Sequence, residues 1–479
     1  MKSLVWFRSD LRLEDNPALF HACRDSAGGV IAVFLFSADQ WRRHDWGPRK
    51  TAYVLRNLES LGGDLAAIGI PLLVEKAPLF SDSPKALQKI LERHCCKALY
   101  FNREYEFNEA ARDEQVTNRV LDRGIAVRAF DDQMILAPGT IRTQKGGAYS
   151  VFTPFWRNWS QHVDKQLPAP LPKPSAASTD TSLEFRLPEF VRSRRPVECS
   201  EVHFTVGERA AKEQLNSFLT QAASDYHRLR DDPAANGTSG LSAALALGVL
   251  SPRTCLDRAI EPGDGLILGG HEGVQAWIRQ LAWRDFYRQV LVSFSRVSRG
   301  RSFIEWTDQV EWRDNEDDLD AWRNGQTGVP LVDAGMRQLR QTGWLHNRVR
   351  MVTAMYLAKD LLLDWRQGEA HFMRQLVDGD FANNNGGWQW SASTGVDAAP
   401  YFRIMNPWTQ ASRFDPQGEY IKTWVPELRE VDSSDLHDPR KLRVSIPAGV
   451  EYPEPLVDHR SARIRAVAAF EEAKQLSTP

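Results

Sequence analysis

Apolar and polar positions alternate between two kinds of segment along the first 130 residues. Short runs rich in β-branched and aromatic residues occupy residues 4–7, 30–36, 71–74, 98–101 and 126–130. Stretches with helical periodicity, such as residues 50–68 and 83–94, lie between them. This alternation, with short turns, is typical of a parallel sheet that carries helices on both faces. The pattern predicts a Rossmann-like α/β domain over residues 1–133, although no GxGxxG dinucleotide fingerprint follows the first run.

The pattern changes after this domain. Residues 134–205 are rich in Pro, Ser and Arg, and the sequence LPAPLPKP at residues 167–174 is typical of a linker. From residue 206 onward the periodicity is helical and strand-like runs are scarce. The sequence therefore predicts an interdomain linker over residues 134–205 and a larger all-α domain over residues 206–479.

Composition limits the class of protein. A chain of 479 residues is too long for one ordinary core, and 42% hydrophobic and 25% charged residues are usual for a soluble globular protein. No apolar run has the length of a membrane span, and the first residues are not a secretory signal. The five Cys residues have neither CxxC nor zinc spacing, so we expect no metal site and reduced thiols in the cytoplasm. The net charge of −2 does not indicate a nucleic-acid-binding protein, although a local basic patch can be offset elsewhere.

The most unusual segment is DGDFANNNGGWQW at residues 378–390. Three Asn and two Gly in a row favour neither helix nor strand. Amides and carboxylates can bind the edge of a flat polar ligand, Gly allows close backbone approach, and Trp can stack on the ligand. The segment therefore indicates a site for a flat, polar, aromatic ligand. Eleven of the 16 Trp residues lie between Trp277 and Trp424, which fits either a large core or an aromatic-rich cavity.

Two helical stretches place polar and aromatic side chains on one face. The first set has the spacing i, i+3, i+4 and i+7 and comprises Trp344, Asn347, Arg348 and Met351. The second set lies in the helical stretch 272–290 and comprises Trp277, Gln280, Trp283 and Arg284. Each set is either the wall of a pocket or the polar edge of an amphipathic helix.

Small hydroxyl side chains precede another helical pattern. The sequence NGTSGLS at residues 236–242 opens a helix predicted over residues 243–250. Backbone N–H groups and hydroxyls at a helix N-terminus suit a phosphate, but Ser and Thr also cap most helices. The segment is therefore either a phosphate site or a simple N-cap.

Six ordered motifs carry a resemblance to a known family. They are LVWFRSDLRLEDN at residues 4–16, TSGLS at 238–242, WRDFY at 283–287, GWLHNRVRM at 343–351, the segment 378–390, and DAAPYFR at 397–403. Over almost the whole chain the sequence resembles the photolyase/cryptochrome flavoproteins, and most closely the bacterial class I cyclobutane pyrimidine dimer (deoxyribodipyrimidine) photolyases. The resemblance implies an N-terminal α/β domain and a helical domain that binds FAD folded into a U shape.

The resemblance also implies which residues bind FAD. The hydroxyl segment at residues 238–242 would contact the phosphates, and Asn384 would face flavin N5. Arg350 and Asp378 would form an ion pair beside the isoalloxazine ring. The full set implied to bind FAD is Tyr226, Thr238, Ser239, Gly240, Leu241, Ser242, Trp277, Arg284, Asn347, Arg350, Asp378, Gly379, Asp380 and Asn384.

The implied reaction is the light-driven repair of pyrimidine dimers in DNA. Reduced FAD would give an electron to a dimer that has left the duplex, the cyclobutane ring would split, and the electron would return. The residues implied to act on the dimer are Gln280, Trp283, Asn347, Met351, Asn384 and Trp390, with the two indoles as apolar walls. The residues implied to bind DNA are Arg230, Gln280, Trp283, Arg284, Asn347, Arg348 and Arg403, with the arginines at 230, 348 and 403 near phosphates.

The same motifs separate the members of the family. Asn347 and Met351 stand where (6-4) photolyases usually have His, and Asn384 stands where plant-type cryptochromes have Asp and animal-type ones usually have Cys. A plain FAD oxidoreductase would usually carry a dinucleotide fingerprint, which the chain lacks. Gln280 replaces the Glu that is typical of dimer photolyases, so a cryptochrome-type blue-light photoreceptor with little repair activity is the alternative. We interpret Gln280 as tolerated, because Gln donates and accepts hydrogen bonds without a raised pKa.

An antenna and an electron path are also implied. His44, Asn108 and Glu109 match the folate-binding positions of photolyases that use 5,10-methenyltetrahydrofolate; a deazaflavin or an empty site are the alternatives. Without the resemblance, Asn108 and Glu109 are only the acidic first turn of a helix. The family's chain of electron donors matches Trp388, Trp365 and Trp312, of which we interpret Trp365 as buried and Trp312 as near the surface. We expect a monomer.

Overall fold

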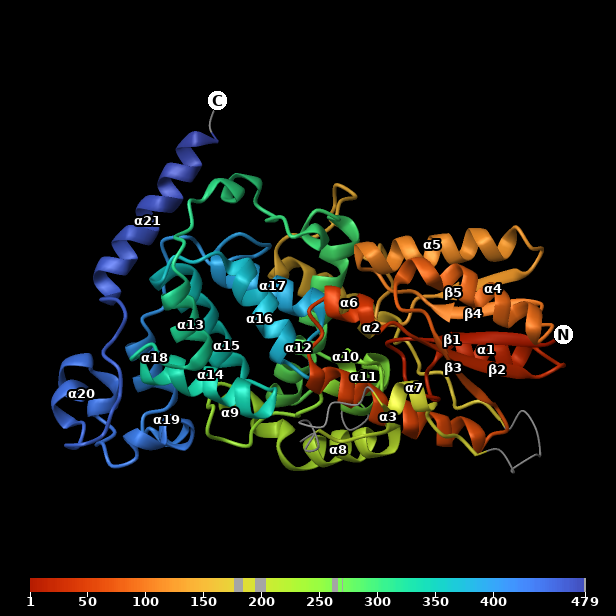
Figure 1. Ribbon diagram of the computed structural model, residues 1–479, viewed down its shortest axis with the longest axis horizontal. Coiled ribbons are helices and arrows are strands. Elements are labelled where there is room, and N and C mark those ends of the chain that lie inside the picture. Colours follow the sequence, from red (N-terminus) through yellow and green to blue (C-terminus); the bar gives the residue numbers. More distant parts are fainter. Residues whose placement is uncertain (176–183, 194–203, 261–265, 269, 478–479) are drawn as a thin grey trace. The chain divides into compact units, whose positions relative to one another are not determined.

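The computed structural model describes residues 1–175, 184–193, 204–260, 266–268 and 270–477 (Figure 1). The chain divides into two compact units. Unit 1 comprises Met1–His227, Ser239–Ser295 and Val377–Ala382. Unit 2 comprises Arg228–Thr238, Arg296–Leu376 and Asn383–Pro479. The predicted linker at residues 134–205 lies partly outside the described residues, as does Cys199, and the domain boundaries at 133 and 205 stay predictions.

Unit 1 is built on a five-stranded parallel sheet with the strand order β3-β2-β1-β4-β5. The strands are β1 (Ser3–Phe7), β2 (Val30–Phe36), β3 (Leu72–Lys76), β4 (Ala98–Asn102) and β5 (Ala126–Phe130). In the central strand, Val5 is paired with Ala32 of β2 on one side and with Tyr100 of β4 on the other. All residues of β1 and β2 are buried, as expected for strands covered on both faces. The predicted α/β fold is confirmed.

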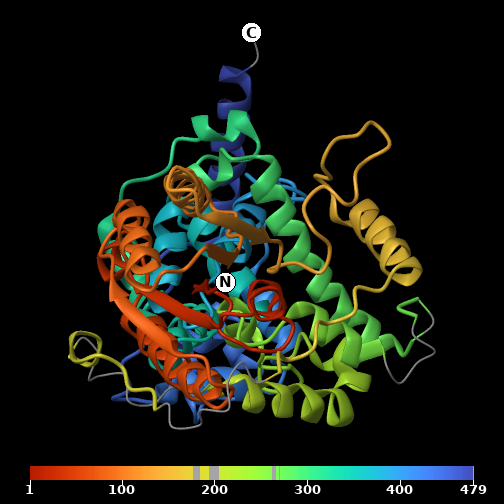
Figure 2. The ribbon, with the colours of Figure 1, turned by 90° about the vertical axis from the view of Figure 1, so that its right-hand side faces the viewer.

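Helices cover both faces of this sheet (Figures 1 and 2). α4 (Ser83–Arg93) and α5 (Phe107–Leu121) pack on the face that carries Leu4 and Trp6. α1 (Pro17–Asp25) and α3 (Pro48–Ala66) lie on the opposite face, and α2 (Ala38–Arg43) precedes α3. A short turn between α2 and α3 carries His44 and Trp46, which positions both near the start of α3.

The remaining helices of unit 1 are α6 (Phe152–Lys165), α7 (Glu189–Arg192), α8 (Glu208–Gln221), α10 (Ser242–Ala246), α11 (Pro252–Ile260) and α12 (Glu272–Ser293), while α9 (Tyr226–Leu229) crosses the boundary between the units. α12 confirms the helix predicted over residues 272–290. The helix predicted over residues 243–250 is shorter than expected and ends at Ala246. Gly248 has a φ of 60°, and a Cβ there would overlap the backbone of Ser9, which follows β1. Only Gly fits this left-handed turn so close to another backbone segment.

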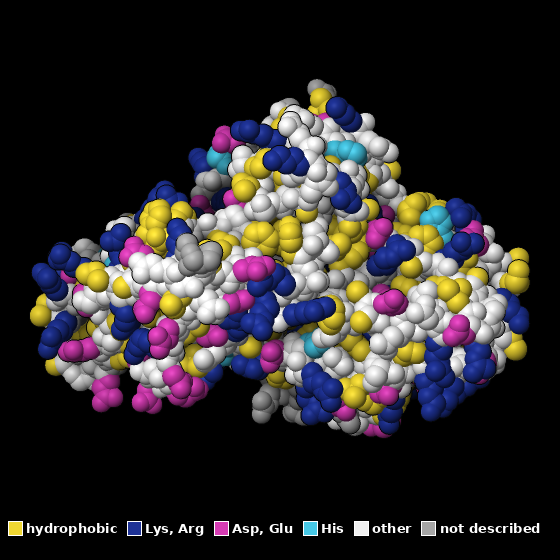
Figure 3. Space-filling view, turned by 90° about the horizontal axis from the view of Figure 1, so that it is seen from above, with side chains coloured by type: hydrophobic (Ala, Val, Ile, Leu, Met, Phe, Trp, Pro, Cys, Tyr) yellow, Lys and Arg dark blue, Asp and Glu magenta, His cyan; other side chains and the backbone are white. Residues whose placement is uncertain are grey.

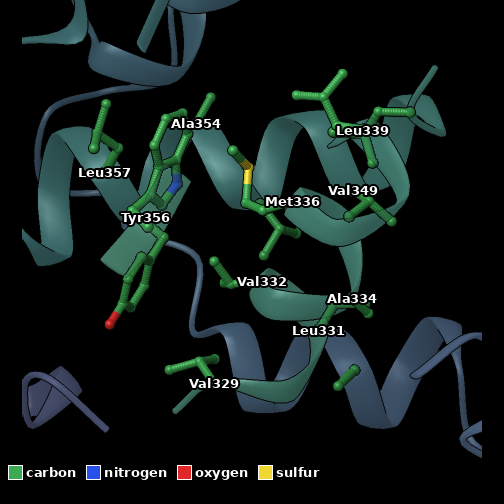
Figure 4. Packing of buried hydrophobic residues seen from close by; sticks show 14 of the residues in the cluster. Val329, Leu331, Val332, Ala334, Met336, Leu339, Val349, Ala354, Tyr356 and Leu357 are labelled. Carbon is green, nitrogen blue, oxygen red and sulfur yellow. The ribbon is translucent and has the colours of Figure 1, made fainter. Parts of the chain in front are cut away.

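Unit 2 is helical in the part that the structure describes. Its helices are α13 (Glu316–Asn324), α14 (Pro330–Thr342), α15 (Asn347–Met355), η6 (Tyr356–Asp360), α16 (Trp365–Gln375), α17 (Phe381–Ala392, which begins in unit 1), α18 (Pro407–Phe414), α19 (Glu419–Trp424), α20 (Pro439–Ser445) and α21 (His459–Leu476). α14 and α15 enclose a buried core that includes Val332, Leu339, Val349 and Leu357 (Figure 4). The predicted helical character of the C-terminal half is confirmed.

The Asn-rich segment is helical, and the prediction that it favours neither helix nor strand is wrong. α17 takes in all three Asn and both Gly residues. Asn385 donates to the carboxylate of Glu369 at 2.9 Å, and Gln389 donates to the side-chain oxygen of Asn385 at 2.8 Å. Trp388 is buried in the core of unit 2. Tertiary contacts therefore override the poor helix propensity of the segment.

The predicted face on α15 is correct except for Trp344. α14 ends at Thr342, and the next residue, Gly343, adopts a left-handed conformation with a φ of 71°. The ring of His346 then caps α15 by accepting the N–H of Arg348. Trp344 lies in the turn between the two helices, so it does not share the helical face that carries Asn347 and Met351.

Charged side chains of both signs are interspersed on the face shown in Figure 3, in agreement with the small net charge of −2. None of the helices among the described residues has the length and apolar character needed to cross a membrane.

Candidate functional site

Helix α8 brings two parts of the predicted FAD site together in unit 1. The ring of Phe218 lies 5.9 Å from that of Tyr226 and 5.3 Å from that of Trp277, measured between centroids. One turn earlier, Gln214 donates from Nε2 to the carbonyl oxygen of Ser239 at 2.8 Å. Residues at i and i+4 share a helix face. α8 therefore holds the aromatic pair and the hydroxyl segment in one place.

The hydroxyl segment turns sharply at Gly240. This residue has a φ of 64°, and a Cβ there would lie 2.6 Å from the side-chain amide nitrogen of Gln214. Leu241 is buried, whereas Ser239 is half-buried and Ser242 is exposed at the start of α10. Because α10 has only five residues, its dipole is weaker than expected. Hydroxyl and backbone N–H groups are therefore the main features that would suit a phosphate.

Arg284 of α12 is a buried cation whose guanidinium donates to carbonyl oxygens, those of Gln133 and, at 3.0 Å, Leu245. Burial, reinforced by the nearby Arg288, lowers its pKa to about 10, so the side chain still carries its charge at neutral pH. Its direct partners are carbonyl oxygens, and the charges of Asp380 and Asp285 compensate it in part. The site therefore fits an anionic cofactor such as FAD.

Two buried cations hold the Gly379 backbone and the Asp380 side chain in unit 1. Arg288 of α12 forms an ion pair with Asp380, and Lys50 of α3 donates from Nζ to the carbonyl oxygen of Gly379 at 2.6 Å. Burial lowers the pKa of Lys50 to about 8, and nearby carboxylates, chiefly Asp380, oppose this shift. The segment predicted to contact FAD is thus held from α3 and from α12.

Gln280 and Trp283, the residues of unit 1 predicted to receive the dimer, are both half-exposed on α12. Phe152 stacks on the indole of Trp283 with a centroid separation of 3.6 Å and an interplanar angle of 8°. Gln280 donates from Nε2 to the carbonyl oxygen of Ala276 at 3.1 Å. The indole is therefore held rigidly, and the Gln280 amide lies one turn before Arg284.

In unit 2, α15 presents the other predicted contacts with the lesion. Asn347 is exposed, Met351 is half-exposed, and Asn347 Nδ2 lies 3.9 Å from Met351 Sδ. Arg348 forms an ion pair with Asp231 at 2.8 Å, and its guanidinium lies 4.2 Å from the ring centroid of Phe414. The structure thus confirms that Asn347 and Met351 are neighbours on one face of a helix.

Three arginines of unit 2 have different environments. Arg403 is exposed, and Arg230 is half-buried with its Nε 3.9 Å from the carboxylate of Asp231. Arg350 donates from Nε to the carbonyl oxygen of Leu345 at 2.8 Å. The ion pair predicted between Arg350 and Asp378 would join a residue of unit 2 to a residue of unit 1, and it stays a prediction.

The predicted residues of α17 differ in exposure. Asn384 is half-buried and donates from Nδ2 to the carbonyl oxygen of Glu369 at 3.1 Å. Trp390 is half-exposed. Trp388 is only 2% exposed, and its ring lies 4.9 Å from that of Phe372. The helix thus combines one buried Trp with two accessible polar or aromatic side chains.

The three Trp residues of the predicted electron path differ in exposure within unit 2. Trp365 is fully buried, as predicted, at the start of α16. Trp312 is half-buried between the exposed residues Glu311 and Asp314, and its ring lies 5.9 Å from that of Phe470. Trp388 and Trp365 are therefore shielded from water, and Trp312 is the member of the set nearest to solvent.

The predicted antenna residues meet in unit 1. His44 Nδ1 lies 3.1 Å from the carboxylate of Glu109, and His44 Nε2 lies 3.1 Å from Asn108 Nδ2 and 2.9 Å from Gln40 Nε2. Asn108 and Glu109 occupy the first turn of α5, and His44 comes from the turn after α2. Burial, reinforced by the nearby Glu109, raises the pKa of Glu106 to about 8. The cluster is a compact polar site at the ends of β2 and β4.

Several residues that shape these sites were not predicted from the sequence. They are Lys50, Gln133, Phe152, Gln214, Phe218 and Arg288. The spacing of Arg288, one turn after Arg284, is a signal that the helical periodicity could have provided. The other five come from distant segments and carry no local signal, because their roles depend on tertiary contacts.

Comparisons with known proteins agree with this geometry. The family described as DNA photolyase matches residues 3–175, and the FAD binding domain of DNA photolyase matches residues 277–472. The deoxyribodipyrimidine photo-lyase of Escherichia coli (strain K12) is 44% identical over 472 residues, which cover 98% of this chain and 99% of that protein.

Solved structures give the same result. A bacterial class III photolyase from Agrobacterium tumefaciens has a TM-score of 0.88 at 33% identity, covering 99% of this chain and 98% of that one. An archaeal photolyase from Sulfolobus tokodaii with two FAD molecules has a TM-score of 0.82 at 29% identity, covering 98% of this chain and all of that one, 100%. The chain belongs to the DNA photolyase family, and its C-terminal half carries the FAD-binding domain of that family.

Proposed function

We propose that the protein is an enzyme that repairs cyclobutane pyrimidine dimers in DNA by light-driven electron transfer from reduced FAD. The supporting observation is that Asn347 is exposed and that Gln280, Trp283, Met351 and Trp390 are half-exposed, although two of these four are indoles and one is a thioether. Core packing would bury an indole or a thioether, so their exposure beside polar amides favours contact with a ligand. A flat base needs such an apolar wall and such hydrogen-bonding groups once it has left the duplex.

The proposed roles follow from the chemistry of these side chains. Trp283 and Trp390 would wall the dimer, Met351 and Asn347 would contact its bases, and the Gln280 amide would bind a carbonyl oxygen. FAD, when bound in its reduced form, supplies the electron that splits the cyclobutane ring and receives it back afterwards. The protein positions the dimer and excludes water.

We also propose that FAD is bound by the residues inferred from the family motifs. In unit 1, the hydroxyl segment at residues 239–242 would bind the phosphates, Arg284 would compensate their charge, and Asp378 and Asp380 would bind polar groups of the cofactor. Tyr226 and Trp277 would pack against it. In unit 2, Asn384 would face the flavin, and Thr238, Asn347 and Arg350 would complete the set.

DNA binding is proposed to depend on three arginines of unit 2, Arg230, Arg348 and Arg403, which would contact phosphates near the lesion. The interspersed surface charge favours a local rather than a global attraction to DNA. Each phosphate contact contributes to the salt dependence of binding.

The proposal also covers the antenna, the cellular location, the oligomeric state and the domain organisation. Folate would bind beside His44, Asn108 and Glu109, since a carboxylate and an amide can bind the edge of a pterin ring. We further propose a monomeric cytoplasmic protein with an antenna domain at residues 1–133, a linker at 134–205 and an FAD- and DNA-binding domain at 206–479. An absorption spectrum with flavin bands and a near-ultraviolet peak tests both cofactors.

The decisive experiment measures repair and binding together. Chemically reduced protein and a thymine-dimer oligonucleotide are illuminated, and dimer loss is quantified beside identical dark and (6-4)-lesion samples. Filter binding at several salt concentrations compares the dimer oligonucleotide with intact DNA. We expect dimer splitting only in light, and tighter, salt-sensitive binding of the damaged strand. Intact dimers after illumination of the reduced protein would contradict the proposal.

One observation favours a second function. Gln280 replaces the Glu that is typical of dimer photolyases, and a cryptochrome-type photoreceptor with little repair activity would tolerate this change. The same assay separates the two functions, because a photoreceptor would show a photoreducible flavin and no dimer splitting.

A further inference from the structure

Lys50 contacts both the turn that carries the candidate antenna residue His44 and the backbone of the candidate flavin segment. It lies in the first turn of α3 and is only 4% exposed. Its ammonium lies 3.6 Å from the ring centroid of Trp46, and it donates to the carbonyl oxygen of Gly379 at 2.6 Å. Trp46 stacks in turn on Trp41 with a centroid separation of 5.0 Å. The ammonium is thus fixed between an indole and the 378–380 segment, all within unit 1.

The charge of Lys50 acts in an acidic environment. The carboxylates that interact with it are Asp380, Glu106, Glu109 and Asp378. Arg288 pairs directly with Asp380. Burial, reinforced by Glu109, raises the pKa of Glu106 to about 8, which favours its neutral form. The pKa of Lys50 itself is lowered to about 8, so it keeps its charge at pH 7.

We infer that Lys50 is a positioning residue that sets the electrostatic potential at the flavin: it holds the Gly379 carbonyl and places a buried positive charge behind the segment that contacts FAD, which makes the cofactor easier to reduce. The inference rests on the proposed FAD site. A buried cation favours added negative charge nearby, because screening is weak at such a site. Removing the Lys50 charge takes away this favourable interaction, while Asp380 stays paired with Arg288.

The test measures the midpoint potential of the bound flavin at pH 7 in the dark. The parent is compared with Lys50→Met, which removes charge and hydrogen bond, and with Lys50→Gln, which keeps an N–H donor without the charge. Both variants should reduce at a lower potential, with the equilibrium constant for two-electron reduction about tenfold smaller, a shift of about 30 mV. Lys89→Met, which removes an exposed lysine on α4 of the same unit, is the matched control and should leave the potential unchanged.

The outcomes separate this inference from the proposed function. If the flavin in Lys50→Gln has the same midpoint potential as in the parent, the inference is overturned, because the effect would then not depend on charge. Unchanged potentials in both variants would overturn it as well. If the parent protein binds no FAD, that result contradicts the proposed function and not the role of Lys50 alone. Far-ultraviolet circular dichroism shows whether each variant folds. If Lys50→Met does not fold, Lys50→Gln still tests the inference.

Discussion

At the scale of single residues, Gln280 is the most informative position for repair. Its amide can hold a thymine carbonyl oxygen at any working pH, whereas a Glu must stay protonated to donate. We expect Gln280→Ala to lower the quantum yield of repair several-fold, since one lost hydrogen bond costs about 1 kcal/mol. Gln280→Glu should equal or exceed the parent near neutral pH. The yield is measured with reduced flavin and saturating dimer DNA, and three equal yields would show that the side chain does not contact the dimer.

The second prediction at the scale of single residues concerns Glu109 and the binding of the antenna. Its carboxylate pairs with His44 at 3.1 Å in the cluster proposed to bind folate. Glu109→Ala should abolish the near-ultraviolet chromophore and leave the flavin bands intact, because the FAD residues come from other elements. Absorption spectra of both purified proteins, reconstituted with folate and FAD, measure the outcome. A near-ultraviolet peak of parental height in the variant would remove Glu109 from the site.

Residue roles were predictable to different extents, and the difference has a physical basis. His44, Asn108 and Glu109 belong to motifs, and the structure brings them together as predicted. Lys50 and Arg288 carry no such signal, because a Lys or Arg on a helix is usually solvated. Only the tertiary fold shows that both are buried against the 378–380 segment.

At the scale of elements, the packing of α16 against α17 depends on one glycine. A Cβ at Gly368 would overlap the ring of Trp388, whereas a Cβ at Gly387 would meet no atom within 4 Å. We expect Gly368→Ala to lower the free energy of unfolding by about 1–3 kcal/mol through overpacking. Gly387→Ala is the matched control, which should be neutral or stabilising by up to about 1 kcal/mol. Urea unfolding of the FAD-free proteins compares them, and equal losses in both variants would contradict the assigned contact.

The same elements show where local sequence fails as a guide. Three Asn and two Gly predict no regular structure at residues 383–387, yet α17 is helical there. The helix is stabilised because Asn385 donates to the carboxylate of Glu369 and accepts a hydrogen bond from Gln389. The helical spacing of Trp277, Gln280 and Arg284 predicted α12 correctly, but such spacing does not reveal hydrogen bonds between side chains of different elements.

The short helix η6 gives a prediction about pH. Lys359 is fully buried, with its ammonium 3.5 Å from the ring centroid of Phe470 on α21, and burial lowers its pKa to about 7. In the unfolded chain its pKa is about 10.4. Between these values the unfolded state binds more protons, so this lysine makes the protein more stable as pH rises, by up to about 1.4 kcal/mol per pH unit.

Lys359→Met should remove this contribution. Urea unfolding at pH 7 and pH 9 is compared for the parent, for Lys359→Met and for the exposed-lysine control Lys89→Met. The parent and the control should gain stability relative to Lys359→Met between the two pH values. Parallel changes in all three proteins would show that Lys359 keeps an ordinary pKa.

At the scale of the whole molecule, the fold class was predictable because the two halves have different periods. Apolar runs at residues 4–7 and 30–36 predict buried parallel strands, and the change to helical spacing after residue 206 predicts the second fold type. Which segments belong to each compact unit could not be predicted from these periods. Residues 239–295 and 377–382 belong to unit 1 although they follow the predicted linker. Contacts such as Lys50 to Gly379 join segments 329 positions apart, which no local pattern records.

Light-driven reduction of the flavin also belongs to the scale of the whole molecule, because electrons must pass from the solvent-exposed surface to the buried interior. Trp388 and Trp365 are buried and Trp312 is half-buried beside exposed acidic residues, where an oxidised indole can release its proton to water. Trp312→Phe should therefore block stable photoreduction of FAD but spare repair when the flavin is reduced chemically. Trp365→Phe should act in the same way and also lower the free energy of unfolding by about 1–3 kcal/mol, because its indole is fully buried.

The control for this route is a buried Trp that lies beside it. Trp322 is fully buried, its ring lies 6.0 Å from that of Trp388, and its Nε1 donates to the carbonyl oxygen of Thr353 at 3.1 Å. Trp322→Phe should destabilise the protein but leave photoreduction intact, which separates loss of packing from loss of electron transfer. Flavin absorption under blue light with an external reductant measures the rate. Undiminished photoreduction in a triple Trp388→Phe, Trp365→Phe, Trp312→Phe variant would leave these residues as core and require another donor path.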